Sequence, residues 1–315
     1  MMLKFQSEQV TLLELFSSTL YFSAMRDKWE EMIKHIESCL EAYMNALPPN
    51  YRSKPFPDQP DIAWGHRVLP NFRNTLVKLN DAHIMLAHGD MSALGYANCV
   101  KSDFKGQLDY FADWMNSSDR KIYEDCISSA TERAHNIALT DEALWQSLDL
   151  PRLHEELARF SGYLKIRNHR INSGVFVRSG EKTTVNGIYV PDVESGCPQF
   201  LGTHRKRAPM TSICVGTEDL INPITGKKYA EQNIYKEVEC TWHLLEESDD
   251  IQNSNIKTTQ TFQSLRVPGG QLCPKSGFYF TSAFLDSRKR FVEGEMMPSL
   301  NSTYGQTIWQ WEEGQ

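Results

Sequence analysis

The spacing of apolar residues changes once along this chain, near Leu164, and this change limits the folds that the chain can adopt. Before it, apolar side chains recur every three or four residues, as in the run from Trp29 to Leu40. That period is typical of amphipathic helices. After it, glycines cluster, and β-branched and aromatic residues alternate with polar ones, as in strands. We therefore expect an α+β fold, with an α-helical bundle over residues 1–163 and a β-rich domain over residues 164–315.

Turn signals divide the helical part into segments. The apolar pattern from Val10 to Leu47 predicts one long helix or two end-to-end helices, which the prolines at 48 and 49 stop. Residues 48–63 contain five prolines and should form a loop. Pro70 suits the first turn of the next helix. A later helix should run from Arg120 to about Leu139, and Thr140 to Glu142 should begin another, short one.

A short pattern occurs twice in the last third of the chain. The copies contain Gly187, Tyr189, Phe200, Pro209 and Trp242, and then Gly277, Tyr279, Phe291, Pro298 and Trp309. Glycine to proline spans 22 and 21 residues, and tyrosine to phenylalanine spans 11 and 12. Matched gaps favour duplication of one small β-unit, over about 174–248 and 262–315, with chance similarity as the alternative. We also expect a polar linker from Asp249 to Thr261.

One interval of the repeat differs strongly between the copies. Proline to tryptophan spans 33 residues in the first copy and 11 in the second, which indicates an insertion of about 22 residues. We place it around Gly216 to Tyr235. An addition to one copy of a repeat is usually a loop without a role in the core.

Charge and cysteine content restrict the compartment and the partners. The net charge is −7, and all of the excess acid lies in residues 1–163, where 16 Lys and Arg face 23 Asp and Glu. This balance disfavours nucleic acid as a partner and allows a basic protein. Seven cysteines without a C-x-x-C pair favour buried free thiols in a reducing cytoplasm over disulfides or zinc. No apolar run reaches the roughly 18 residues of a membrane span.

A search for chemistry finds no constellation typical of an enzyme. The phosphate-binding, dinucleotide-binding, serine-hydrolase and zinc-protease motifs are all missing from the sequence. His83 and His88 are five residues apart, which is the wrong spacing for two ligands on one helix face. Cys197 and Cys273 would need a neighbouring base to act as nucleophiles, and structural thiols are the preferred interpretation. We therefore expect no catalytic residue, no cofactor and no metal site.

Two segments are candidates for recognition of a partner. One is the basic run from His204 to Arg207, which we expect to project into solvent from a loop. The other is the inserted segment of the first β-unit. The candidate binding residues are Glu218, Asp219, Lys227, Lys228, Tyr229, Glu231, His204 and Arg205.

Three stretches resemble a family of bacterial immunity proteins encoded beside polymorphic toxins, notably Rhs-type effectors of the type VI secretion system. The stretches are Pro60-Asp61-Ile62-Ala63-Trp64-Gly65-His66-Arg67-Val68-Leu69-Pro70-Asn71-Phe72-Arg73, Val100-Lys101-Ser102-Asp103-Phe104-Lys105-Gly106-Gln107, and the unit from Cys273 to Trp311. The resemblance covers most of the chain. It implies a non-enzymatic protein that binds and neutralises its cognate toxin in the cytoplasm, and it defines no binding residues.

The alternatives are a hydrolase that reverses the toxin's modification and an adaptor or chaperone that loads an effector for export. If the toxin acts on nucleic acid or on nucleotides, its cleft should be basic, and the acidic helical part should speed its capture. Buried aromatic anchors should then supply most of the affinity.

Overall fold

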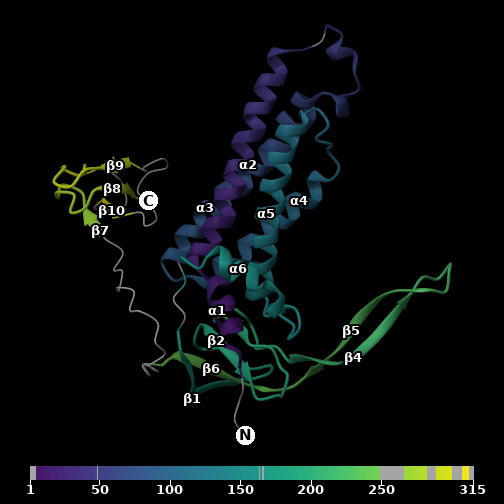
Figure 1. Ribbon diagram of the computed structural model, residues 1–315, viewed down its shortest axis with the longest axis vertical. Coiled ribbons are helices and arrows are strands. Elements are labelled where there is room, and N and C mark those ends of the chain that lie inside the picture. Colours follow the sequence, from purple (N-terminus) through teal and green to yellow (C-terminus); the bar gives the residue numbers. More distant parts are fainter. Residues whose placement is uncertain are drawn as a thin grey trace. The chain divides into compact units, whose positions relative to one another are not determined.

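The computed structural model describes residues 5–47, 49–162, 164, 167–248, 266–281, 289–299 and 307–311. The chain divides into two compact units, Met1–Asp250 and Ile251–Gln315 (Figure 1). Helices come first and antiparallel sheets follow, so the expected α+β class is confirmed. The helices end near residue 163, but the first unit continues through the first sheet to Asp250. The whole of the expected linker, from Asp249 to Thr261, lies outside the described residues.

The helical part contains α1 (Ser7–Phe16), α2 (Thr19–Asn45), α3 (Leu69–Ala87), α4 (Ala97–Gln107), α5 (Ser117–Asp141) and α6 (His154–Arg159). A π-helical segment, η3 (Asp61–Val68), leads into α3, and short 3-10 segments form η1 (Tyr51–Ser53), η2 (Phe56–Asp58), η4 (Met91–Tyr96) and η5 (Leu150–Leu153). None of the described helices combines the length and the apolar character that a membrane span requires.

Capping side chains explain several helix ends. The Ser18 hydroxyl accepts a hydrogen bond from the Tyr21 amide and starts α2, while Asn116 accepts from two amides and starts α5. The short helix expected at Thr140 is wrong, because α5 continues through this residue to Asp141. The chain leaves the helix at Ala143, which has a positive φ of 49°.

One hydrophobic core joins the helices to one face of the first sheet. It contains Trp29 and Phe72 from the bundle together with Ile188, Phe200 and Leu245 from the strands. The core also encloses polar groups that satisfy one another. The Trp29 indole donates to the carbonyl oxygen of Phe72 at 3.1 Å. One face of the first sheet is therefore built onto the bundle, while its other face has a smaller core of its own around Tyr189, Leu201 and Trp242.

The first unit contains strands β1 (His169–Arg178), β2 (Gly187–Pro191), β3 (Gln199–Leu201), β4 (Thr211–Ile221), β5 (Lys228–Val238) and β6 (Thr241–Glu247). The second unit contains β7 (Arg266–Pro268), β8 (Gly277–Phe280), β9 (Lys289–Phe291) and β10 (Ile308–Trp311). Strand order is β1-β6-β2-β3 in the first sheet and β7-β10-β8-β9 in the second, while β4 and β5 form a separate two-stranded ribbon. The two four-stranded sheets therefore have the same antiparallel strand plan, with β1, β2, β3 and β6 corresponding to β7, β8, β9 and β10.

Equivalent residues pair across equivalent strands of the two sheets. In the first sheet Gly187 pairs with Leu201, Tyr189 with Leu244, and Trp242 with Val177. In the second sheet the corresponding pairs are Gly277 with Phe291, Tyr279 with Trp311, and Trp309 with Val267. The paired tyrosines and tryptophans of the sequence repeat therefore occupy equivalent positions. Leu201 and Phe291 both pair with the glycine of their copy, so Leu201 is the structural equivalent of Phe291, and the sequence alignment of Phe200 with Phe291 is wrong by one residue. Successive strand residues face opposite sides, and Phe200 packs into the helical core while Leu201 packs on the other face.

The repeated side chains also make the same hydrogen bonds. Trp242 and Trp309 each donate an indole N–H to a proline carbonyl at 2.8 Å, that of Pro209 and of Pro298 respectively. The Tyr189 and Tyr279 hydroxyls donate to the carbonyl four residues earlier, at 2.8 and 2.7 Å. The repeated aromatic residues are thus core residues with a fixed polar partner.

Candidate functional site

Among the strands that follow the helices in the first unit, β4 and β5 form a ribbon that has no counterpart among the described strands of the second unit. Its strands pair from Thr211 opposite Val238 to Ile221 opposite Lys228, and it extends from the first sheet as a long arm (Figure 1). The Asn222 side chain closes the turn by accepting hydrogen bonds from the amides of the two residues after Pro223. This ribbon is the insertion that the sequence placed at Gly216 to Tyr235.

Large apolar side chains at the outer end of the ribbon are uncovered. Ile224 is 91% exposed, Tyr229 68% and Ile221 57%. Single exposed apolar residues are common on protein surfaces, but three next to one turn form a patch. The outer edges of β4 and β5 pair with no other strand among the described residues. An edge of this kind is a template for pairing with another chain.

Six sequence-derived candidates lie on this ribbon: Glu218, Asp219, Lys227, Lys228, Tyr229 and Glu231. Lys228 forms an ion pair with Asp219 across the strands and a second with Glu231, with 3.7 Å between Nζ and Oε2. The pKa of Glu231 lies below its usual range because it accepts a hydrogen bond from the Thr217 hydroxyl and faces Lys228. These exposed charges contact one another and leave the apolar tip free, so the ribbon presents an apolar patch with a charged stem.

The structure does not bring the remaining two candidates to the ribbon tip. His204 Nε2 lies 2.9 Å from a carboxylate oxygen of Asp141, and Arg205 donates to the carbonyl of the same residue. The guanidinium of Arg205 suits the negative end of the α5 dipole. The expectation that this run projects into solvent holds for His204, Lys206 and Arg207, which are exposed, and is wrong for Arg205, which is half-buried. His204 and Arg205 attach their loop to α5.

An apolar cleft, here called the distal cleft, lies where the proline-rich loop around residues 54–63 faces residues 109–114, which follow α4. It has a volume of about 920 Å³ and is lined by Tyr43, Phe56, Tyr110, Phe111 and Trp114 among others. Phe56 is 73% exposed and Phe111 79% exposed. Sequence reasoning did not single out these residues. Large aromatic residues within loop segments were the available signal, because a loop seldom buries them unaided.

A cleft of about 610 Å³ lies between α1 and the first sheet. His169 is almost fully buried there, and its Nε2 lies 2.8 Å from Oε1 of Glu14. Ser17 and Ser18 also line the cleft, but their hydroxyls donate to main-chain carbonyls of α1. This geometry provides a histidine with a carboxylate partner and no hydroxyl free to act as a nucleophile, so these residues do not assemble a hydrolytic triad.

The two cysteines considered as nucleophiles are buried. Burial raises the pKa of the Cys197 thiol far above its ordinary value. Cys273 is also buried, and its sulfur donates to the carbonyl oxygen of Lys275 at 3.1 Å. A protonated, inaccessible thiol is a poor nucleophile. Both cysteines therefore belong to the packing of their units.

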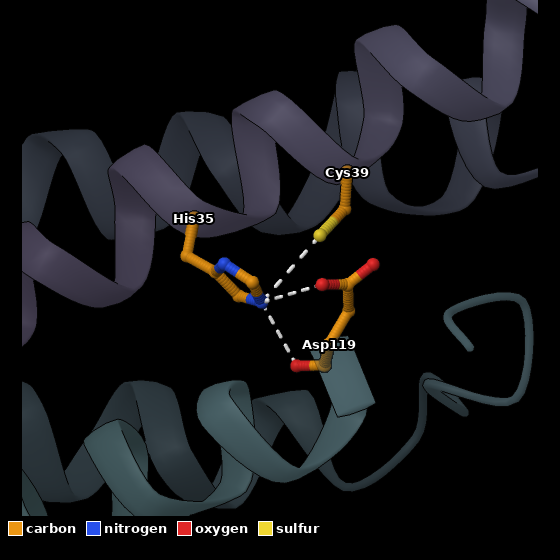
Figure 2. A group of neighbouring side chains, drawn as sticks. All are labelled: His35, Cys39 and Asp119. Carbon is orange, nitrogen blue, oxygen red and sulfur yellow. Dashed lines mark hydrogen bonds and ion pairs between the residues drawn. The ribbon is translucent and has the colours of Figure 1, made fainter. Parts of the chain in front are cut away.

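One cluster of described residues has the donor atoms of a metal site, and sequence reasoning missed it. His35 and Cys39 lie on α2, and Asp119 lies in the first turn of α5 (Figure 2). Their nitrogen, sulfur and carboxylate oxygen all lie within 4.8 Å of one another. Burial and the nearby Asp119 raise the pKa of Cys39 to about 11, so the thiol is protonated. A histidine and a cysteine four residues apart on an amphipathic helix were the available signal.

Comparisons with protein-family models, with curated proteins and with solved structures found no match to this chain.

Proposed function

We propose that this chain is an immunity protein that binds and neutralises the toxin domain of a secreted effector, of the Rhs or type VI class, in the bacterial cytoplasm. The observation that carries the proposal is the β4–β5 ribbon. It is added to one of two equivalent β-units, and it leaves Ile221, Ile224 and Tyr229 uncovered. The sequence resemblance described above supplies the class of partner.

The ribbon suits recognition better than stability. Only 11 residues separate Pro298 from Trp309, against 33 between Pro209 and Trp242, so the second copy has no room for such a ribbon and still forms a core. Exposed apolar area and open strand edges carry a risk of aggregation unless a partner covers them. A partner protein that covers the open strand edges would form main-chain hydrogen bonds along them. The same partner would bury the apolar side chains at the ribbon tip, which would act as anchors.

The charge of the chain favours a basic partner. Residues 1–163 carry the entire net charge of −7. Toxins that act on nucleic acids or nucleotides need basic clefts, and opposite charge speeds association. The distal cleft is a second surface at which such a partner could bury aromatic side chains, since Phe56 and Phe111 are uncovered there.

The register of the ribbon defines a direct test. Thr217 pairs with Asn233, so replacing residues 218–232 by Asn-Gly shortens the ribbon to a two-residue turn between paired residues. The probe is the C-terminal domain of the effector encoded beside this chain. We expect wild-type chain to restore growth of cells that express this domain, and the shortened chain to bind it at least 100-fold more weakly and to give no protection.

Point variants separate recognition from folding. Ile224→Ser and Tyr229→Ser should each weaken binding at least tenfold, while Val77→Ser, at a 58% exposed position of α3, should leave it unchanged. Unchanged affinity of the shortened chain would remove the ribbon from the binding surface. Absence of protection by the wild-type chain against the isolated toxin domain would instead favour an adaptor. Rescue of many modified target molecules by one chain would favour a hydrolase.

A further inference from the structure

The cluster of His35, Cys39 and Asp119 combines donors from two helices that pack against each other. His35 and Cys39 are one helical turn apart, so they project from the same face of α2. Asp119 starts the facing helix α5. Figure 2 shows the three side chains converging on one small space between the helices. Sites on helices are better fixed than sites on loops, because packing holds each backbone in place.

The distances are close to those of a tetrahedral metal site. Zinc binds sulfur at about 2.3 Å and nitrogen or oxygen at about 2.0–2.2 Å, so ligand atoms in a tetrahedron are roughly 3.3–3.6 Å apart. Cys39 Sγ and His35 Nε2 are 3.5 Å apart. His35 Nε2 and the Asp119 carboxylate oxygen Oδ1 are 3.9 Å apart. All three donor atoms lie within 4.8 Å of one another, so a rotation that moves the Asp119 carboxylate by roughly 1 Å toward Cys39 would complete three tetrahedral corners.

Neighbouring groups leave this oxygen available. The Asn116 amide donates to Oδ2 of Asp119, which holds the carboxylate with its other oxygen toward His35. His35 Nε2 lies 2.8 Å from the main-chain oxygen of Asp119, a hydrogen bond that a metal ion would replace. Hydrogen bonds that orient a ligating carboxylate are a regular feature of metal sites.

We propose that His35, Cys39 and Asp119 bind one divalent ion of the zinc class, with water at the fourth position. Thiolate and imidazole favour zinc, cobalt or similar ions over magnesium or calcium, which prefer oxygen ligands. On binding, the S–H bond of Cys39 breaks, its proton passes to solvent, and a sulfur–metal bond forms. The imidazole gives up the hydrogen on Nε2 that bonds the Asp119 carbonyl oxygen and, as a neutral ligand, carries its hydrogen on Nδ1 instead. The positive end of the α5 dipole opposes a cation, but the thiolate and carboxylate together cancel both charges of the ion.

Solvent can reach the site. The side chain of Asp119 is 35% exposed and that of His35 17% exposed. The fourth position is therefore open to water. The ion links α2 to the start of α5, and ions that bind only the folded chain raise its stability. At a free zinc concentration 100 times the dissociation constant, the melting temperature should rise by roughly 5–10 °C.

Cobalt is the probe for the test, because a cobalt–thiolate bond gives a charge-transfer absorption in the near ultraviolet. Reduced, metal-free, full-length chain is titrated with Co²⁺, and we expect this band to saturate at one ion per chain and to disappear when Zn²⁺ is added. Cys39→Ser should abolish the band and weaken binding at least 100-fold. Asp119→Asn should weaken it at least tenfold. Cys99→Ser, which removes another partly buried thiol, should leave the titration unchanged.

Alkylation of the wild-type chain tests the site without any substitution. Zn²⁺ should slow the reaction of Cys39 with iodoacetamide at least tenfold, measured by peptide mass spectrometry, and leave Cys99 unaffected. No cobalt band in the wild-type chain, an unchanged band in Cys39→Ser, or equal alkylation of Cys39 with and without Zn²⁺ would each overturn the assignment. Toxin protection plays no part in either measurement, so their outcome is separate from that of the proposed function.

Discussion

A buried hydrogen-bond network in the helical core allows a sharp test of the packing. The Tyr21 hydroxyl donates to Glu156 Oε2 at 2.9 Å and accepts from the Asn136 side-chain amide at 2.9 Å. All three residues are buried. Tyr21→Phe keeps the ring, which packs against Phe16 and Phe160 with centroids 4.9 and 5.3 Å away. It removes only the oxygen that joins the two polar side chains.

The expected cost follows from the groups left behind. A hydrogen bond to a charged group contributes about 1.5–3 kcal/mol and one between neutral groups about 1 kcal/mol. Glu156 retains its ion pair with the partly exposed Arg159, so the loss at the carboxylate should be at the lower end. We therefore expect Tyr21→Phe to lower the free energy of unfolding by about 2.5–3 kcal/mol. In a unit of this size that corresponds to roughly 5–12 °C in melting temperature.

Tyr123 provides a matched control in the same core. Its hydroxyl is buried and has no hydrogen-bond partner among the described residues. Tyr123→Phe should therefore change stability by less than about 0.5 kcal/mol or raise it slightly, since it removes an unsatisfied polar group. Urea denaturation followed by far-ultraviolet circular dichroism measures both variants. If the two substitutions cost the same within about 0.5 kcal/mol, the hydroxyl network does not stabilise the bundle as argued.

Three further outcomes can be checked on the full chain. Gly180 has a positive φ of 87°, so Gly180→Ala should lower the free energy of unfolding, measured by urea titration, by about 1–2 kcal/mol. The control is Gly162→Ala: no atom lies within 4 Å of the added methyl group, so the free energy of unfolding should change by less than about 0.5 kcal/mol. Burial raises the pKa of Tyr21 and raises that of Cys240 to about 11, so the unfolded chain releases protons that the folded chain keeps. The contribution of these two groups to stability should then be constant below about pH 8 and fall as pH rises beyond it, and a melting temperature that rises from pH 8 to pH 10.5 would contradict this. Replacing residues 218–232 by Asn-Gly should leave the melting temperature within about 2 °C in differential scanning calorimetry, because the side-chain hydrogen bonds and ion pairs described for these residues stay within the ribbon, and a larger loss would mean that the ribbon supports the fold.

Local signals in the sequence account for most of the architecture. Apolar period separates the helical part from the strands, because a buried stripe must recur every 3.6 residues on a helix and every two on a strand. Pro49, Asn116 and the turn glycines mark ends that depend only on nearby backbone. The repeat could be recognised because Tyr189 and Trp242 occupy the same structural positions as Tyr279 and Trp309, and equal structural demands preserve equal spacing.

Contacts between distant segments were decided by the tertiary structure. Phe200 and Leu201 are neighbouring apolar residues, and only the pairing of β2 with β3 determines which one faces the helices. His204 appears as part of a solvated basic run, yet it binds Asp141, 63 residues earlier. Nothing local in the sequence indicates that the end of α5 lies beside this loop.

In the two proposed sites, too, part of the arrangement follows from local sequence and part only from tertiary packing. The insertion is visible in the sequence as an unequal interval, but its form as a two-stranded ribbon with an uncovered tip follows from strand pairing. The spacing of His35 and Cys39 is local and is set by one turn of helix. Their approach to Asp119, 80 residues from Cys39, depends on how α2 packs on α5. That packing results from many apolar contacts summed over both helices, so no short pattern in the chain specifies it.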